Sequence, residues 1–241
     1  MSYQPREFWD RRLSEHFDLR GTGETGLSLA YNRACYRLRG RVLERALREA
    51  GMDPANRSVL DVGCGSGFFT AYFLGRGARV TGIDIAPTSV ERLRARHPEA
   101  RFVLADVSEG PLEGRFDLVN AFDVLYHIVD DARWEAALRH LARALNPGGL
   151  LLVTDTFAER PGSQPHNRMR ALARYRAVLD AEAVEPGDLY PTHVLLNREL
   201  GALRFLNRLP SLLLALDRAL LGLGFGTDPA VSKLLVARRR T

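Results

Sequence analysis

A glycine-rich segment in the first third of the chain carries the clearest chemical signal. Residues 59–62 are apolar except for Asp61, and glycines follow at 63, 65 and 67 before a run that suits a helix. An apolar run, a glycine loop and a helix in succession are typical of a strand–loop–helix unit. A loop without side chains lets backbone amides approach a ligand, and the positive end of the helix favours an electron-rich group. The segment therefore predicts a binding site for such a ligand.

A second carboxylate, Asp84, ends the segment 78–84, which is predicted to be the second strand. At the tip of the second strand of such a unit, a carboxylate can accept hydrogen bonds from both hydroxyls of a ribose. The alternative role is that of a helix N-cap, but residues 86–89 already supply a helix start. We therefore expect Asp84 to bind a ribose.

The glycine spacing departs from that of dinucleotide-binding loops. In that fingerprint the third glycine comes one position later, where this chain has Phe68. Among 34 basic residues only Lys233 is a lysine, and it follows serine rather than glycine. A phosphate-binding Gly-Lys-Ser/Thr loop and a Tyr-x-x-x-Lys dehydrogenase pair are therefore not expected. An NAD-dependent oxidoreductase is the disfavoured alternative.

The segment Asp-Val-Gly-Cys-Gly-Ser-Gly at 61–67 resembles the first motif of class I S-adenosylmethionine-dependent methyltransferases of the small-molecule type. The resemblance extends over residues 57–156. It implies that the loop wraps the methionine end of the cofactor, S-adenosyl-L-methionine, and that Asp61 orients its amino group. It also implies that Asp106, after the third strand, takes the adenine amino group, with Val107 beside the ring. The cofactor-binding residues expected on these grounds are Asp61, Gly63, Gly65, Asp84, Ile85, Asp106, Val107 and Phe122.

The segment 116–128 resembles the fourth strand of the same family and the turn that follows it. Ligands of open parallel sheets lie beyond the carboxyl ends of the strands, so His127 is expected near the reactive methyl group. With an ordinary pKa near ~6.5, its imidazole could take a proton from a hydroxyl nucleophile. The alternative is that His127 hydrogen-bonds the cofactor or packs under the N-terminal helices. Candidate substrate contacts, for which packing is the competing explanation, are Trp9, Tyr31, Tyr126 and His193.

Alternating strands and helices must position these side chains. Such alternation without repeats is typical of a parallel sheet with helices on both faces. The resemblance implies an α/β, Rossmann-like three-layer sandwich with an N-terminal helical cap, in which a seven-stranded, mostly parallel sheet has an antiparallel last strand. The sixth strand is expected in or near 193–196 and the last one at 233–237, with an arginine-rich helix over 166–180 between the fifth and sixth strands.

The chain of 241 residues is expected to form a single methyltransferase domain. Within it, the leucine-rich run 209–223 is expected to cap an apolar substrate, to form the face of a homodimer or to be an ordinary core helix. The parts of the domain are expected to be N-terminal cap helices in 1–54, a cofactor-binding core in 55–160, and a C-terminal half in 161–241 with a cap segment at 199–230.

Composition limits the class of protein and its partners. Apolar residues make up 46% and charged residues 26%, as in ordinary globular proteins, and the two cysteines, Cys35 and Cys64, predict neither a disulfide framework nor a metal site. The net charge of +5 is spread along the chain apart from a short basic end, so no nucleic-acid partner is expected. No apolar run reaches the ~18 residues of a membrane span, so no membrane partner and a cytoplasmic location are expected.

The predicted function is methyl transfer from S-adenosylmethionine to a small-molecule acceptor, with an apolar molecule as one option and secondary metabolism as one setting. Oxygen is favoured over nitrogen as the methylated atom because of His127. A scaffold that binds the cofactor without transferring the methyl group is the non-enzymatic alternative.

Overall fold

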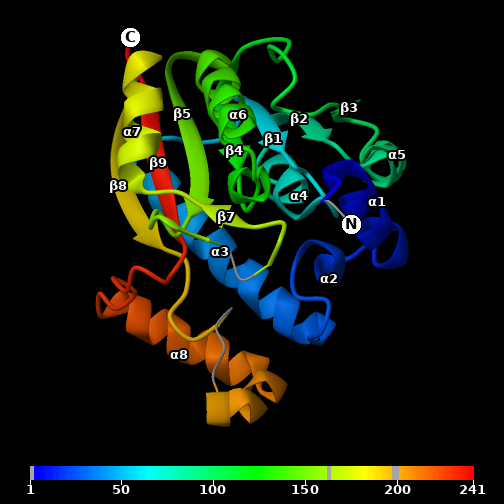
Figure 1. The fold of residues 1–241 in the computed structure, drawn as a ribbon, viewed down its shortest axis with the longest axis vertical. Helices are drawn as coiled ribbons and strands as arrows, with labels where there is room; N and C mark the ends of the chain where they lie inside the picture. Colours follow the sequence, from blue (N-terminus) through cyan, green and yellow to red (C-terminus); the bar gives the residue numbers. More distant parts are fainter. Residues whose placement is uncertain (1–2, 162–163, 197–200) are drawn as a thin grey trace.

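Seven strands form the main sheet of the computed structural model, which describes residues 3–161, 164–196 and 201–241 (Figure 1). Their order across the sheet is β3-β2-β1-β4-β5-β9-β8. β9 runs antiparallel to both β5 and β8, and all the other neighbours pair in parallel. The expected mostly parallel sheet with an antiparallel last strand is thereby confirmed. The strands are β1 (Ser58–Val62), β2 (Arg79–Asp84), β3 (Arg101–Leu104), β4 (Phe116–Ala121), β5 (Leu145–Asp155), β8 (Val184–Pro191) and β9 (Lys233–Arg239).

Two apolar cores, one on each face of the sheet, make the three layers. Successive residues of a strand point to opposite faces, so a strand buried on both sides is a continuous apolar run. Val59 therefore belongs to one core and Leu60 to the other. The first core contains residues of α3 (Leu29–Glu49) and α4 (Phe68–Leu74), and the second contains residues of α6 (Asp131–Arg143) and α7 (Leu172–Ala181).

The first helix, α1 (Pro5–Glu15), lies beside α5 (Pro87–Arg96). The carboxylate of Asp10 accepts a 2.8 Å hydrogen bond from the N–H of Thr88, in the first turn of α5. The Arg12 side chain donates to the carbonyls of Gly21 and Gly23 and so connects α1 to the turn around α2 (Leu19–Thr22). These contacts hold α1 on α5 and on the turn around α2, so the N-terminal helices form the expected cap.

Two expected elements have different bounds. The helix expected over 166–180 begins only at Leu172, and Arg168–Met169 form β7, which pairs with β6 (Arg160–Pro161). The buried Arg170 side chain, bonded to Asp131 and to the carbonyl of Ile128, fixes the segment before α7 in a non-helical position. The sixth strand of the sheet is β8, which ends before 193–196. Pro186 and Gly187 are residues that argue against a strand in the sequence, so β8 was not expected at these positions. β8 can contain a proline because it lies at the edge of the sheet.

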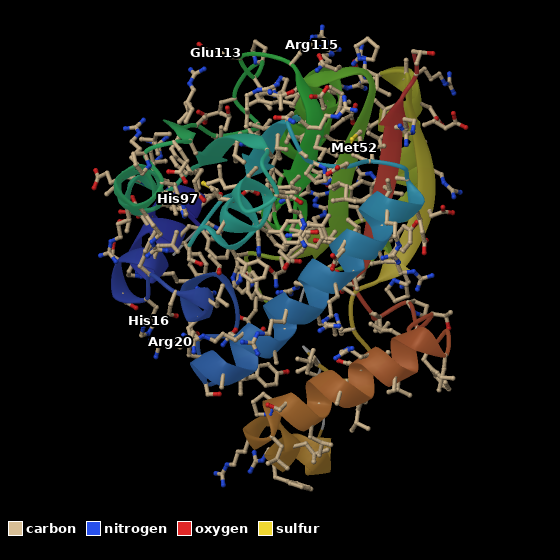
Figure 2. The ribbon with its side chains drawn as sticks, turned by 180° about the vertical axis from the view of Figure 1, so that it is seen from behind. His16, Arg20, Met52, His97, Glu113 and Arg115 are labelled. Atoms are coloured by element: carbon tan, nitrogen blue, oxygen red, sulfur yellow. The ribbon has the colours of Figure 1, made fainter. Side chains whose placement is uncertain are left out.

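The C-terminal helix, α8 (Pro210–Gly222), packs on α3 and follows the 3-10 helix η2 (Gly201–Arg208). Both ribbon views show α3 between α8 and the sheet (Figures 1 and 2). The buried carboxylate of Asp217 accepts hydrogen bonds of 2.6 to 2.8 Å from the N–H groups of residues 194–196. These bonds fix α8 to the turn after β8. Within the described ranges, no helix has the length and apolar character that crossing a bilayer requires.

Candidate cofactor and acceptor site

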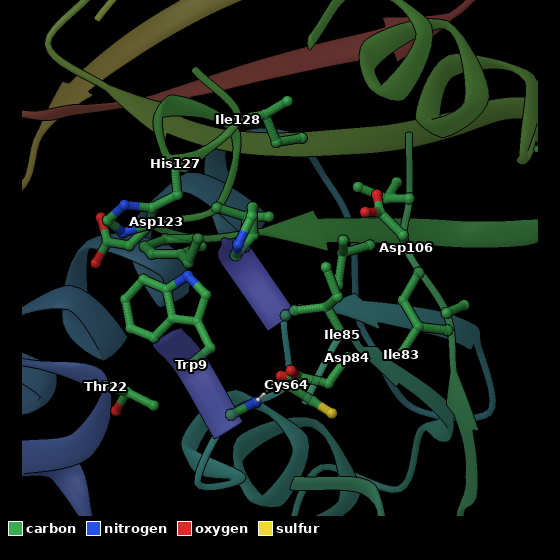
Figure 3. A pocket seen from close by; sticks show the side chains of 18 of the residues that line it. Trp9, Thr22, Cys64, Ile83, Asp84, Ile85, Asp106, Asp123, His127 and Ile128 are labelled. Carbon is green, nitrogen blue, oxygen red and sulfur yellow. Dashed lines mark hydrogen bonds between the residues drawn. The ribbon is translucent and has the colours of Figure 1, made fainter. Parts of the chain in front are cut away.

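A cavity of about 330 Å³ lies at the carboxyl ends of β1, β2, β3 and β4, beneath α1 (Figure 3). Its wall includes Trp9 and His127 as well as every residue that was expected to contact the cofactor. The topology brings these residues together because parallel strands end at the same edge of a sheet. The expected cofactor residues in the wall are Asp61, Gly63, Gly65, Asp84, Ile85, Asp106, Val107 and Phe122.

The glycine loop after β1 needs glycine for two physical reasons. Gly63 has φ +63° and Gly65 has φ +53°, in the left-handed region that other residues rarely adopt. A Cβ atom on Gly63 would lie 2.6 Å from a methyl group of Val124, and one on Gly65 would lie 2.5 Å from a methyl group of Thr22. The loop is therefore packed between the turn after β4 and the N-terminal cap.

Asp61, at the methionine end expected from the motif, is held by two side chains. Its Oδ1 accepts from the Asn120 amide at 2.8 Å, and its Oδ2 accepts from the Thr70 hydroxyl at 2.6 Å. Burial raises the pKa of Asp61 to about 6. A carboxylate has about four acceptor positions, so two remain for a further donor such as an ammonium group. The residues present thus fit the amino group of the cofactor.

Asp84 connects the end of β2 to the glycine loop. Its Oδ2 accepts from the N–H of Gly65 at 2.8 Å, and its Oδ1 accepts from the N–H of Ala86 at 2.9 Å. Burial raises the pKa of Asp84. A carboxylate at the end of β2 is the kind of acceptor that the two hydroxyls of a ribose require.

Asp106 differs from the other two acids because it already has a cationic partner. Its Oδ2 lies 2.7 Å from Nη2 of Arg133, on α6, and its Oδ1 accepts from the N–H and the hydroxyl of Ser108. Arg133 also lines the cavity. Sequence reasoning missed this arginine because it lies 27 residues after Asp106, and no local motif joins the two.

The far end of the cavity has an aromatic wall. His127 lies in the short 3-10 helix η1 (Leu125–His127). Its Nδ1 is 3.2 Å from the carbonyl oxygen of His166. Because a carbonyl only accepts, Nδ1 carries the proton of the neutral imidazole and Nε2 is the unprotonated nitrogen. Burial lowers the pKa of His127 to about 4. The ring of Trp9 lies edge-on to His127 at 4.7 Å, the ring of His166 stacks on His127 at 5.4 Å, and the Trp9 and His166 rings are themselves 6.2 Å apart.

A buried ion pair that sequence reasoning missed lies in the same end of the cavity. Oδ2 of Asp123 is 3.0 Å from Nη2 of Arg39, which reaches in from α3. Asp123 has φ +57°, and Thr154 exchanges two hydrogen bonds with its backbone N–H and its Oδ1. Burial disfavours the charged form of Arg39, but the carboxylate of Asp123, together with smaller contributions from neighbours such as Tyr36, raises the pKa of Arg39 overall. The position of Asp123, directly after the apolar fourth strand, was the signal available in the sequence.

Three of the expected substrate contacts lie outside the cavity wall. Tyr31 is buried in the cluster between α3 and α8, and His193 is buried after β8 with Nδ1 2.9 Å from the Thr192 hydroxyl. Tyr126 contacts the His127 ring at 4.3 Å. Of the four expected substrate residues, only Trp9 lines the cavity.

Comparison with known proteins agrees with the fold and with the motif segment. A family model described as a methyltransferase domain matches residues 59–149. The O-methyltransferase cnsE of Penicillium expansum is 32% identical over 157 residues, which cover 61% of this chain and 54% of that protein. The chain spans about half the length of the curated relatives it matches.

Solved structures of low sequence identity share the fold. The magnesium protoporphyrin IX methyltransferase of Synechocystis PCC 6803, solved with S-adenosylhomocysteine, has a TM-score of 0.64 at 18% identity, with 97% of each chain covered. The N-methyltransferase NodS of Bradyrhizobium japonicum, also solved with S-adenosylhomocysteine, has a TM-score of 0.59 at 18% identity, with 88% of each chain covered. Residues 59–149 therefore match a methyltransferase domain model, and the chain shares the class I fold of these solved S-adenosylmethionine-dependent methyltransferases.

Proposed function

We propose that this protein transfers a methyl group from S-adenosylmethionine to a hydroxyl oxygen of a small-molecule acceptor. The observation that carries the proposal is the set of three carboxylates at the ends of three neighbouring strands, all facing one cavity. In this proposal Asp61 holds the amino group, Asp84 the ribose hydroxyls and Asp106 the adenine amino group. Bound S-adenosylmethionine supplies a methyl group that its sulfonium already activates, so no covalent intermediate with the protein is needed.

The protein must then orient the acceptor, exclude water and remove a proton from the hydroxyl. Trp9 and His127 line the end of the cavity beyond the cofactor residues, where they would enclose the acceptor. Because the pKa of His127 is lowered to about 4, its Nε2 is unprotonated near neutral pH and available to accept a proton. The nearby charge of Asp123 favours the imidazolium that would form.

The choice of oxygen rests on His127, because a neutral amine can attack a methyl group before it loses a proton. A base whose pKa is about 4 is weak, and it suits a hydroxyl that is itself acidic, such as a phenol or an enol. The relatives described above include both an O-methyltransferase and an N-methyltransferase, so they are compatible with either acceptor atom.

Two measurements test the proposal. Calorimetry should detect binding of S-adenosylhomocysteine, and labelled S-adenosylmethionine should transfer its methyl group to phenols or enols in a panel that also holds amines and carboxylic acids. Cofactor binding without transfer to any member or to a cell extract would favour the scaffold. Binding of NADH but not of S-adenosylhomocysteine would favour the oxidoreductase.

A further inference from the structure

The segment 204–226, from η2 to just beyond the end of α8, carries an exposed apolar surface. Six large apolar side chains there are between 40% and 74% exposed, and only one other in the described chain, Leu104, is comparably exposed. Large apolar groups that gather on one surface are unusual unless they contact a partner. The surface, called the leucine patch below, consists of Phe205, Leu209, Leu212, Leu216, Leu223 and Phe225.

The structure of α8 keeps the leucine patch facing outward. Leu212 and Leu216 are four residues apart and lie on one face of the helix. A different face carries the buried Leu213 and Asp217, which contact the α3 cluster and the turn at 194–196. Because Asp217 accepts three backbone hydrogen bonds, rolling the helix to bury the patch would leave a buried carboxylate without its donors.

The charges around the leucine patch are mostly positive. Arg204, Arg208 and Arg218 are exposed, and none of them forms an ion pair within the described chain. Of the two nearby acids, Asp217 is buried and Asp228, beyond Phe225, is exposed. Apolar side chains flanked by an excess of arginines are complementary to a surface of anionic lipids. A second copy of the chain would instead bring two sets of arginines together.

We propose that the leucine patch docks this protein on the surface of a membrane that contains anionic lipids. The sequence predicted no membrane partner because no segment is long enough to span a bilayer, but surface docking requires no span. The proposal concerns attachment, and it stands apart from the proposed methyl transfer.

The place where the leucine patch leaves the sheet suggests how the docked protein would be oriented on the membrane. β8 runs parallel to β5, because both pair antiparallel with β9, so β8 ends at the same edge of the sheet as β1, β2 and β4. The segment with the leucine patch leaves from that end. Docking would therefore turn the edge that holds the cavity toward the lipid, where an apolar acceptor dissolved in the membrane could enter.

Co-sedimentation of the full chain with vesicles tests the proposal. The wild type should sediment with vesicles of phosphatidylcholine and phosphatidylglycerol, should stay in solution with phosphatidylcholine alone, and should be released by salt. The triple variant L212S/L216S/L223S should lose binding more than about tenfold, because it removes apolar surface that enters the lipid. The double variant R204Q/R208Q should weaken binding by roughly an order of magnitude.

Matched controls separate the patch from general effects. L104S removes the exposed leucine outside the patch, and R48Q/R176Q removes two exposed arginines elsewhere, so both should sediment like the wild type. Binding of S-adenosylhomocysteine by every variant reports that the fold is intact. Absence of wild-type sedimentation, equal sedimentation with neutral vesicles, or a dimer in analytical ultracentrifugation that only the leucine variant dissociates would each overturn the proposal.

Discussion

The two ends of the cavity are built in different ways. The cofactor end is made of short segments that each follow one strand. Backbone amides of Gly65 and Ala86 fix Asp84, and the side chains of Thr70 and Asn120 fix Asp61. The acceptor end is assembled from distant parts of the chain, with Trp9 from α1, His127 from η1 and His166 from the loop before β7. The local construction of the cofactor end suits a ligand that is the same throughout a family. The residues of the acceptor end come from separate segments, so they can change with the acceptor.

Replacing Asp84 tests the cofactor end most severely. Asp84→Asn removes the charge that would accept from both ribose hydroxyls and turns an acceptor into a donor that faces the N–H of Gly65 or Ala86. At ~1.5–3 kcal/mol for each hydrogen bond to a charged group, we expect about 100-fold weaker binding of S-adenosylhomocysteine in calorimetry. The exposed Asp188→Asn is the control and should bind normally. Unchanged affinity in Asp84→Asn would remove this residue from the cofactor site.

Replacing His127 should affect only the acceptor end. His127→Gln should lower the rate of methyl transfer by roughly 10- to 100-fold, at the weak end of general-base catalysis, and leave cofactor affinity unchanged. His97→Gln, outside the cavity, is the matched control. A parallel loss of cofactor affinity and rate would show that His127 acts on the cofactor, and the two ends would then not be separable.

The pH dependence of the transfer rate tests whether His127 is a buried, neutral imidazole. Because burial lowers the pKa of His127 to about 4, the transfer rate at saturating cofactor should stay level from neutral pH down to about 5 and fall only as the imidazole takes a proton near 4. Cofactor affinity should weaken earlier, as the pH falls through the pKa of about 6 of Asp61 in the free protein. The folded-state pKa of His127 lies below the unfolded value of about 6.5, so the stabilising effect of the neutral form is lost as the pH falls between these two values. A rate profile with its acid limb near 6.5 in the wild type would contradict the buried, neutral imidazole.

The glycine loop should show a moderate effect. Gly63→Ala places a Cβ in a left-handed backbone and 2.6 Å from Val124, so we expect roughly tenfold weaker cofactor binding and a loss of about 1–2 kcal/mol in unfolding free energy. The double variant Gly63→Ala/Val124→Ala should recover part of the loss, because it relieves the contact but not the backbone strain. Gly26→Ala, where no atom lies within 4 Å of the new Cβ, is the control. Full affinity in Gly63→Ala would show that the loop is not rigid.

The smallest effect is expected at Arg133, whose side chain is 48% exposed. Exposed ion pairs contribute about 0–1 kcal/mol, so Arg133→Gln should weaken cofactor binding by only two- to threefold through a less ordered Asp106. Titration at low and high salt measures this change, which should diminish as salt screens the pair. A loss as large as that of Asp84→Asn would mean that Arg133 itself contacts the cofactor.

The sequence predicted the cofactor end because its determinants are local. An apolar run followed by Asp61 or Asp84 identifies the end of a strand, and parallel pairing brings these ends together without further information. The acceptor end could not be predicted in the same way. Arg39 and Asp123 are far apart in the chain, and only the packing of α3 on the sheet joins them. Aromatic residues on helices, such as Tyr31, carry the same pattern whether they line a cavity or fill a core.

A crystal structure of the protein with S-adenosylhomocysteine is the most direct test of the site. We predict one molecule in the 330 Å³ cavity, with its amino group at Asp61, its ribose hydroxyls on the carboxylate of Asp84 and its adenine beside Asp106 and Val107. A ligand bound elsewhere, or bound in the cavity with its ribose away from Asp84, would contradict the assignment of the three strand-end carboxylates to a single cofactor molecule.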